Sequence, residues 1–227
     1  MHPLIQNTLV AAAGIVYVFA VVGIMNYLVK KKNFPKDISR KIVHIAAGSW
    51  LVCWLFMNDA HWSKYFNILP AFIWVILLLL KGFTAKPDDE AVKTMTRTGD
   101  RKELLKGPLY FAAVMCIAGT AWYKTPYALT AMGFLGWGDG LAPLFGQWFG
   151  KHKYNFLSEK SIEGSAAFFI FGLLGAIVFN MLFYPEITWG IILVCGVAAT
   201  LIEAASPKDL DNILIPFIVY FLYSFLF

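Results

Sequence analysis

Long apolar stretches separated by short polar connections run along the whole chain. Eight stretches can be marked: Leu4–Val29, Ile42–Met57, Ile68–Leu80, Pro108–Tyr123, Tyr127–Phe149, Gly164–Tyr184, Thr188–Glu203 and Leu210–Phe227. A helix needs roughly 20 apolar residues to cross the hydrocarbon core. The second, third and fourth stretches are short, but their flanks carry aromatic residues suited to the membrane interface. The pattern predicts an all-α, polytopic integral membrane protein with about eight transmembrane helices.

Composition excludes a soluble globular protein. Apolar residues make up 59% of the 227 residues and charged residues only 15%, whereas soluble domains carry about 25% charged residues. Eight spans would occupy about 160 residues, so residues 1–227 are predicted to form a single transmembrane catalytic domain. The three cysteines lie at unrelated spacings in apolar runs and are interpreted as packing residues. No cleavable signal peptide is expected, since Met1-His2-Pro3 has no basic region.

Basic residues alternate between the two sides of the predicted membrane. All Lys and Arg residues except Lys64 and Lys124 fall in the connections after the first, third, fifth and seventh stretches. Basic connections face the cytoplasm. We therefore expect both termini outside and the functional site facing the cytoplasm, in the cell membrane if the organism is a prokaryote.

Asp139 is the clearest candidate functional residue. It lies deep in the fifth stretch, within Gly136-Trp137-Gly138-Asp139-Gly140, where a carboxylate costs about 2.5–3.5 kcal/mol. The glycines favour a broken or closely approached helix, which is tolerated at depth only in packed protein or beside a polar cavity. Helix packing through Gly136 and Gly140 is the alternative interpretation. It explains the glycines but not the aspartate.

The connection after the fifth stretch has the residue types of a phosphate site. It contains Gly150-Lys151-His152 and then Lys160-Ser161-Ile162-Glu163-Gly164-Ser165. Lysines and hydroxyls at the start of a helix favour phosphate binding, because the first helical N–H groups are free. The spacing from Gly146 is one residue short of a Walker loop. An ordinary capped helix start with cytoplasmic lysines is the alternative.

Three further polar segments flank the apolar stretches. Arg40, Lys41 and His44 precede or begin the second stretch, and a basic membrane anchor is the alternative to a functional role. Glu203 ends the seventh stretch, and Asp211-Asn212 either joins it in a site or caps the last helix. The long mixed-charge connection from Thr84 to Gly107 is predicted to be a solvated or interfacial segment, with a lid as the alternative.

These polar residues all belong to the predicted cytoplasmic half. Acidic groups that hold a divalent cation, beside basic groups that hold phosphates, suit phosphoryl-type chemistry on a lipid. A transporter, the alternative of another class, places its polar groups near the midplane between internal repeats. No convincing repeat is visible in the sequence.

The ordered set of polar segments resembles the phytol/dolichol (polyprenol) kinase family, and part of it resembles the related phosphatidate cytidylyltransferases. The resemblance runs from about residue 40 to residue 216. The matching segments are Arg40 to His44 with Gly48, Gly107 to Tyr110, Gly138 to Ala142, Gly146 to Lys151, Lys160 to Ser165, and Glu203 with Asp211, Asn212 and Pro216. Pro108 stands where many relatives carry Thr, which is a departure from the pattern.

The resemblance implies an enzyme that moves the terminal phosphate of CTP, with Mg²⁺, onto the hydroxyl of phytol, geranylgeraniol or a polyprenol. Its implied catalytic residues are Asp139, Lys160, Glu163 and His44, and its implied metal ligands are Asp139, Glu163 and Glu203. The implied nucleotide-binding and substrate-binding residues are Arg40, Lys41, Gly138, Gly140, Gly150, Lys151, Ser161, Gly164, Ser165, Asp211 and Asn212. A lipid cytidylyltransferase or a CTP-dependent diacylglycerol kinase is the alternative among enzymes.

The expected partners are a nucleoside triphosphate, a membrane-embedded prenyl alcohol and the lipid bilayer, with no nucleic acid. Asp139, Glu163 and His44 all remain candidates for the general base, because residue type does not separate them. The chain length of the alcohol and the oligomeric state also stay open.

Overall fold

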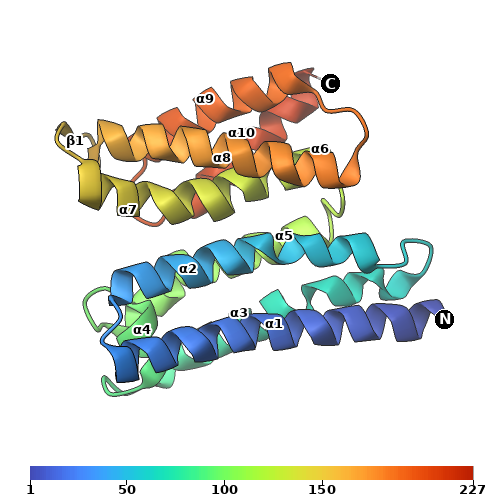
Figure 1. The fold of residues 1–227 in the computed structure, drawn as a ribbon, viewed down its shortest axis with the longest axis horizontal. Helices are drawn as coiled ribbons and strands as arrows, with labels where there is room; N and C mark the ends of the chain where they lie inside the picture. Colours follow the sequence, from blue (N-terminus) through green and yellow to red (C-terminus); the bar gives the residue numbers. More distant parts are fainter. Residues whose placement is uncertain (227) are drawn as a thin grey trace. The chain divides into compact units, whose positions relative to one another are not determined.

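A computed structural model describes residues 1–226 and shows a mostly helical protein (Figure 1). The elements, with 3₁₀ helices η1 to η3 and the π-helix η4, are α1 (Pro3–Lys32), α2 (Lys36–Gly48), η1 (Ser49–Phe56), η2 (Trp62–Ile68), α3 (Leu69–Thr84), α4 (Glu90–Met95), η3 (Arg101–Leu105), α5 (Gly107–Gly119), α6 (Pro126–Met132), η4 (Gly133–Gly138), α7 (Asp139–Phe149), β1 (Lys153–Asn155), β2 (Glu159–Ser161), α8 (Ile162–Phe183), α9 (Trp189–Ala205) and α10 (Asp211–Leu226). Each predicted apolar stretch coincides with a helical segment. The final residue of the eighth stretch, Phe227, lies outside the described residues.

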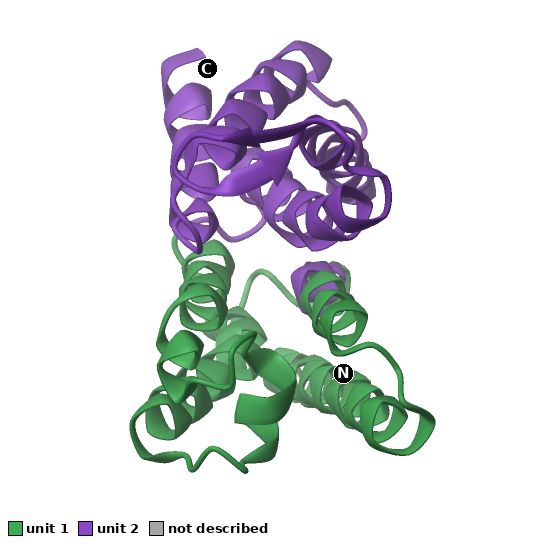
Figure 2. Cartoon of the chain, turned by 90° about the vertical axis from the view of Figure 1, so that its left-hand side faces the viewer, with its two compact units in different colours: residues 1–46, 53–121 green, residues 47–52, 122–227 purple. Residues whose placement is uncertain are grey.

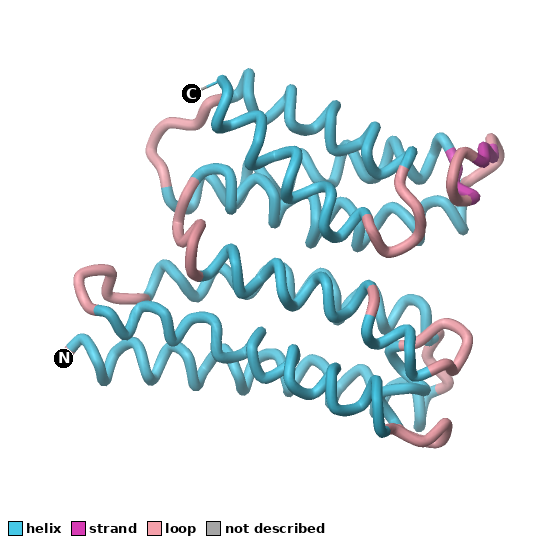
Figure 3. Tube along the Cα trace, turned by 180° about the vertical axis from the view of Figure 1, so that it is seen from behind, coloured by secondary structure: helices cyan, strands magenta, loops and turns pink. Residues whose placement is uncertain are grey.

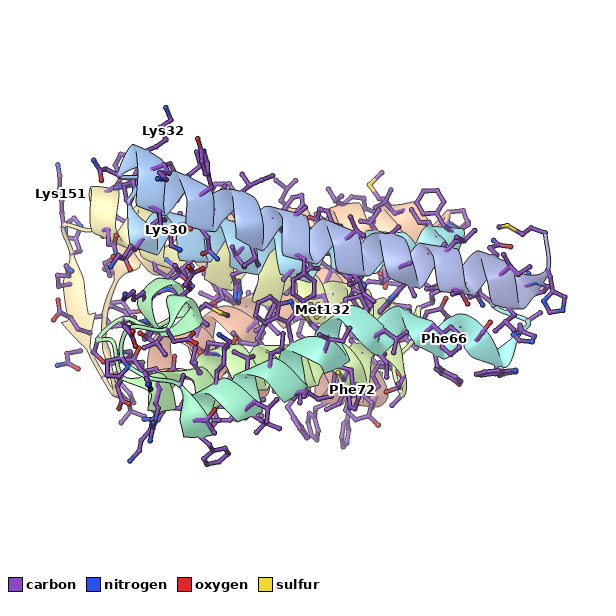
Figure 4. All side chains as sticks on the ribbon, turned by 90° about the horizontal axis from the view of Figure 1, so that it is seen from below. Lys30, Lys32, Phe66, Phe72, Met132 and Lys151 are labelled. Atoms are coloured by element: carbon purple, nitrogen blue, oxygen red, sulfur yellow. The ribbon has the colours of Figure 1, made fainter. Side chains whose placement is uncertain are left out.

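Three helical segments are long and apolar enough to cross a membrane: Pro3–Lys32, Trp62–Thr84 and Ile162–Phe183. Two shorter apolar helices, Trp189–Ala205 and Asp211–Leu226, accompany them. Large apolar side chains such as Phe72 on α3 project outward from these helices (Figure 4), as expected where lipid replaces water. The architecture is that of an all-α membrane protein, and the number of about eight spans stays a prediction.

The chain divides into two compact units (Figure 2). Unit 1 contains Met1–Ala46 and Cys53–Ala121, and unit 2 contains Ala47–Val52 and the residues from Trp122 onward. The short segment Ala47–Val52 belongs to unit 2 because it packs there. Gly48 lies against Gly136, where an added Cβ would come within 3.2 Å of the Gly48 Cα.

Unit 1 is organised around α1, α3 and α5. His2 caps α1 by accepting a hydrogen bond from the backbone N–H of Leu4, and the helix ends at Asn33 in the left-handed conformation. Asn7, fully buried, donates to the Asn58 carbonyl and to Ser63 Oγ. These bonds fix the N-terminal part of α1 against the connection that leads to η2.

The connection between α3 and α5, predicted to be a solvated or interfacial segment, has exposed charged residues but also contains short helices. It forms α4 and η3, and Val92 and Leu104 from these short helices are fully buried with Leu78 of α3. Lys81 binds Asp89 at 2.8 Å, and Lys30, at the end of α1 (Figure 4), binds Glu90. The charges lie outside while the apolar side chains extend the core of unit 1.

Unit 2 is built on a glycine seam between η4 and α8. A Cβ on Gly133 would lie 2.2 Å from the backbone nitrogen of Ala176, and a Cβ on Gly172 would lie 2.2 Å from the Phe134 ring. Only glycine allows backbones to approach this closely. Gly136 lies outside this seam and faces Gly48, while a π-helix stands where a broken or closely approached helix was expected.

Polar side chains also join three helices of unit 2 away from that seam. Thr130 of α6 shares a hydrogen bond of 2.9 Å with the Tyr223 hydroxyl of α10, and Asn180 of α8 donates to Thr130 at 3.0 Å. All three side chains are buried. Their hydrogen-bonding groups satisfy one another, so we interpret this cluster as a fastening between helices.

Replacing Gly133 by alanine should destabilise unit 2, because the new methyl group would overlap the backbone of Ala176. Overpacking costs about 1–3 kcal/mol, which exceeds the roughly 0.5–1 kcal/mol that alanine gains over glycine in a helix. Thermal unfolding of detergent-purified protein measures the effect. Gly190→Ala is the matched control, since nothing lies within 4 Å of its added Cβ. Equal melting temperatures for the two variants would contradict the seam.

Candidate active site

A β-hairpin connects α7 to α8 at one end of unit 2 (Figure 3). Its strands β1 and β2 are antiparallel, and Tyr154 lies directly opposite Lys160. Directly opposed residues place their side chains on the same face of the hairpin. The sequence analysis did not predict these strands.

Lys160 is the centre of the site. Its ammonium group lies 2.6 Å from Glu203 Oε1 near the end of α9 and 3.6 Å from Asp211 Oδ2 at the start of α10. It also donates to the backbone carbonyl of Glu203, one of the last-turn carbonyls of α9 that the helix itself leaves without a partner. One lysine thus joins the hairpin to the ends of two helices.

The surroundings of Lys160 favour its charged form. Burial alone lowers the pKa of a lysine, but the attraction of Glu203 and Asp211, with a weaker contribution from Asp139, raises the pKa of Lys160 above its usual 10.5. The ammonium group therefore stays protonated at physiological pH. Its contribution to stability is complete below the usual pKa and is lost only as the pH rises through the raised value.

Asp139 begins α7 directly after the π-helix η4, half-buried in unit 2. Its carboxylate contributes to the charge balance of Lys160. The structure therefore brings together five residues that the sequence analysis selected, and these residues come from four elements: Asp139, Lys160, Glu203, Asp211 and Asn212.

Asp211 and Asn212 are buried at the start of α10. The backbone N–H and side-chain amide of Asn212 both donate to Asp211 Oδ1, and the amide also donates to the Asp209 carbonyl. Asn212 Oδ1 is buried and accepts no hydrogen bond from a described residue. Buried acceptors normally have partners, so this oxygen is suited to a cation or a donor from a ligand.

The oxygens beside Lys160 suit Mg²⁺ chemically. Asp139, Glu203 and Asp211 supply carboxylates and Asn212 supplies the amide oxygen, the hard donors that Mg²⁺ prefers. Among residues 1–226, no three His, Cys, Asp or Glu side chains are grouped closely enough to hold a metal ion by themselves.

Glu163 has different partners from Glu203. It accepts hydrogen bonds from the backbone N–H of His152 at 3.3 Å and lies 2.7 Å from the His152 ring. Glu203, in contrast, contacts Lys160 and Ser165. Glu163 thus orders the start of the hairpin, and its assignment as a metal ligand stays a prediction.

The predicted phosphate cradle is a tightly packed helix start. Ser161 caps α8 by accepting from the N–H of Gly164; phosphate binding by this segment stays a prediction. A Cβ on Gly150 would lie 2.7 Å from Ser161 Oγ, and one on Gly164 would lie 3.2 Å from the Ala142 carbonyl. Lys151 is exposed on the connection that follows α7.

Arg40, Lys41 and His44 all lie on α2 in unit 1. Arg40 forms an ion pair of 3.2 Å with Asp37 one turn earlier, and the His44 ring packs on Phe111 at 4.1 Å between centroids. Lys41 is buried. Their functional roles stay predictions.

One site residue, Tyr154, escaped sequence analysis. Its hydroxyl lies 2.6 Å from Ser165 Oγ. Ser158, which belongs to the segment predicted to bind phosphate, donates to the Ser206 carbonyl at 3.1 Å. Strands of three residues are too short for a detectable alternation of polar and apolar positions. No sequence signal pointed to Tyr154.

The fold and the site define a helical membrane protein with a charged cluster at the ends of its helices. Curated relatives extend this description. The chain is 32% identical over 221 residues to the "Probable phytol kinase, chloroplastic" of Triticum aestivum, covering 92% of this chain and 73% of the relative. It is 30% identical over 210 residues to "Phytol kinase 1, chloroplastic" of Arabidopsis thaliana (87% and 69%). It is 31% identical over 218 residues to the "Farnesol kinase, chloroplastic" of the same plant (89% and 70%).

The chain therefore belongs to the phytol kinase family, as the ordered polar segments predicted. No protein-family model matches the chain. No solved structure matches it either.

Replacing Glu203 by glutamine should make Lys160 easier to acylate at alkaline pH. Only the neutral amine reacts, and loss of the Glu203 charge removes the main attraction that raises the pKa of Lys160. Pulse labelling followed by peptide mass spectrometry measures the rate at each lysine. The control is Glu159→Gln, which removes an exposed carboxylate that pairs with Lys153. Unchanged Lys160 labelling in Glu203→Gln would contradict the charge balance described above.

Proposed function

We propose that this protein transfers the terminal phosphate of CTP, with Mg²⁺, to the hydroxyl of an isoprenoid alcohol such as phytol, geranylgeraniol or a polyprenol. Membership of the phytol kinase family supports the broader activity, a kinase that acts on a lipid alcohol. One observation carries the site assignment: three carboxylates from different helices act on the half-buried Lys160 at the end of unit 2.

Phosphoryl transfer depends mainly on positioning and on neutralising charge on the phosphate oxygens. Bound Mg²⁺ would supply that neutralisation and align the phosphates. Asp139, Glu203, Asp211 and Asn212 are the residues proposed to hold it together with the phosphates. Glu203 and Asp211 pair with Lys160, Asp139 acts on the charge of Lys160, and the buried Asn212 Oδ1 accepts no hydrogen bond from a described residue. Lys160 carries the matching positive charge and is proposed to bind the transferred phosphate.

The residues that precede and begin α8 are proposed to fix the rest of the triphosphate. Lys151 is exposed and free to meet an anion. Ser161 and Gly164 form the first turn of α8, where helix N–H groups favour negative charge. Glu163 keeps this segment ordered through His152.

The alcohol is proposed to enter from the lipid. Its apolar tail is compatible with the hydrocarbon layer around the helices, and its hydroxyl prefers the interface, where a water-soluble nucleotide arrives. The distribution of basic residues supports a site that faces the cytoplasm and termini that lie outside. Asp139, Glu163 and His44 are the candidate bases for the hydroxyl proton.

A purified-enzyme assay tests the proposal directly. Labelled CTP and ATP are offered with prenyl alcohols of graded length, and both the nucleotide product and the lipid product are identified. We expect CDP and a lipid monophosphate, with CTP preferred. Pyrophosphate release would indicate a cytidylyltransferase, and phosphorylation of diacylglycerol alone would indicate a diacylglycerol kinase. The absence of nucleotide turnover would favour a transporter.

Replacing Asp139 by asparagine should lower turnover by about 100-fold or more, the scale expected when a group that stabilises transition-state charge is lost. The side chain keeps its size, so the protein should remain folded and monodisperse. Steady-state kinetics and size-exclusion chromatography measure the two properties. Asp88→Asn, at an exposed position in unit 1, is the control. Wild-type rates in Asp139→Asn would remove this residue from the site.

A further inference from the structure

Four polar side chains, including that of Glu203, form a ring. Lys160 of β2 lies 2.6 Å from Glu203 Oε1, and Ser165 of α8 lies 3.1 Å from Glu203 Oε2. The Tyr154 hydroxyl of β1 lies 2.6 Å from Ser165 Oγ. The hairpin completes the ring, because Tyr154 and Lys160 are opposed in its ladder.

The chemistry of each group fixes which atom donates and which accepts in this ring. A carboxylate only accepts, so Lys160 donates to one oxygen of Glu203 and the Ser165 hydroxyl donates to the other. A serine hydroxyl has a single hydrogen, so Ser165 must accept its second bond from the Tyr154 hydroxyl. The hydrogen bonds therefore run from Tyr154 to Ser165 and from Ser165 to Glu203, with Tyr154 as the first donor. Bonds aligned in this way strengthen one another.

The fold of the hairpin does not depend on this tyrosine hydroxyl. The Ile162 N–H donates to the His152 carbonyl at 3.0 Å, Ser158 donates to the Ser206 carbonyl, and Glu163 accepts from His152. These bonds hold the strands and the start of α8 in place. The phenol instead orients Ser165, and Ser165 orients the carboxylate that binds Lys160.

We propose that Tyr154 is a positioning residue of the kinase: through Ser165 it fixes the Glu203 carboxylate and so holds Lys160 where the nucleotide phosphate binds. This inference rests on the proposed function. It assigns Tyr154 to the nucleotide side of the reaction. Binding of the alcohol, which reaches the site from the lipid, does not depend on the ring.

Tyr154→Phe tests the proposal, because it removes only the hydroxyl. Loss of one neutral hydrogen bond predicts a rise of about threefold to tenfold in the KM for CTP, with the KM for the alcohol unchanged. A merely structural role would move both constants or the melting temperature. Tyr184→Phe is the matched control, since the Tyr184 hydroxyl donates to the Lys124 carbonyl outside the ring. It should leave both KM values at the wild-type level.

A double-mutant cycle with Ser165→Ala sharpens the test. Once the serine hydroxyl is gone, the Tyr154 hydroxyl has nothing to position, so Tyr154→Phe should have no further effect in the Ser165→Ala background. Additive losses would overturn the proposal. Ser165→Ala also serves if Tyr154→Phe fails to fold, because it breaks the same ring and should raise the KM for CTP alone.

A second readout needs no turnover. In ligand-free protein, Tyr154→Phe should increase the rate of amine acylation at Lys160 relative to the exposed Lys153, because the orientation of Glu203 is loosened. If wild-type protein uses no CTP while this labelling effect is present, the proposed function fails and the ring geometry stands. If wild-type protein is active and Tyr154→Phe matches it in both KM for CTP and labelling, the positioning role fails.

Discussion

A half-buried positive charge joins four elements of unit 2. An ammonium group removed from water costs several kcal/mol unless opposite charges and hydrogen bonds replace the solvent. Lys160 meets this requirement with Glu203, Asp211 and Asp139, and with the last-turn carbonyl of α9. The end of α9, the starts of α7 and α10 and the hairpin therefore have to lie together. Their meeting point is where the proposed phosphate chemistry takes place.

The glycine seam provides the rigid support for this meeting point. Close approach of η4 and α8 at Gly133 and Gly172 holds the segment that ends at Asp139 against the helix that begins after Lys160. Apolar packing in lipid lacks the hydrophobic driving force found in water, so small residues and polar contacts carry much of the association. The site thus depends on glycines that have no chemistry of their own.

The sequence predicts the helices and much of the cluster, for physical reasons. Helical segments follow from long apolar runs, and Asp139, Glu203 and Asp211 stand out because charges beside such runs are costly. Three features were not predictable in this way. The hairpin strands are too short to show a period, and Val92 and Leu104 lie in a mixed-charge connection with few apolar residues. The partner of Glu163 depends on the exact path of the chain near His152.

The π-helix has a consequence for the direction in which Asp139 points. Each residue of an α-helix turns the chain by about 100° around the axis, so a wide turn that accommodates one additional residue rotates everything beyond it. Gly133–Gly138 forms that wide turn immediately before Asp139. Deleting a single glycine from it would restore a regular helix of nearly the same length, with the carboxylate on another face. The number of residues in the turn, and not their chemical type, therefore sets the direction in which the Asp139 side chain leaves the helix.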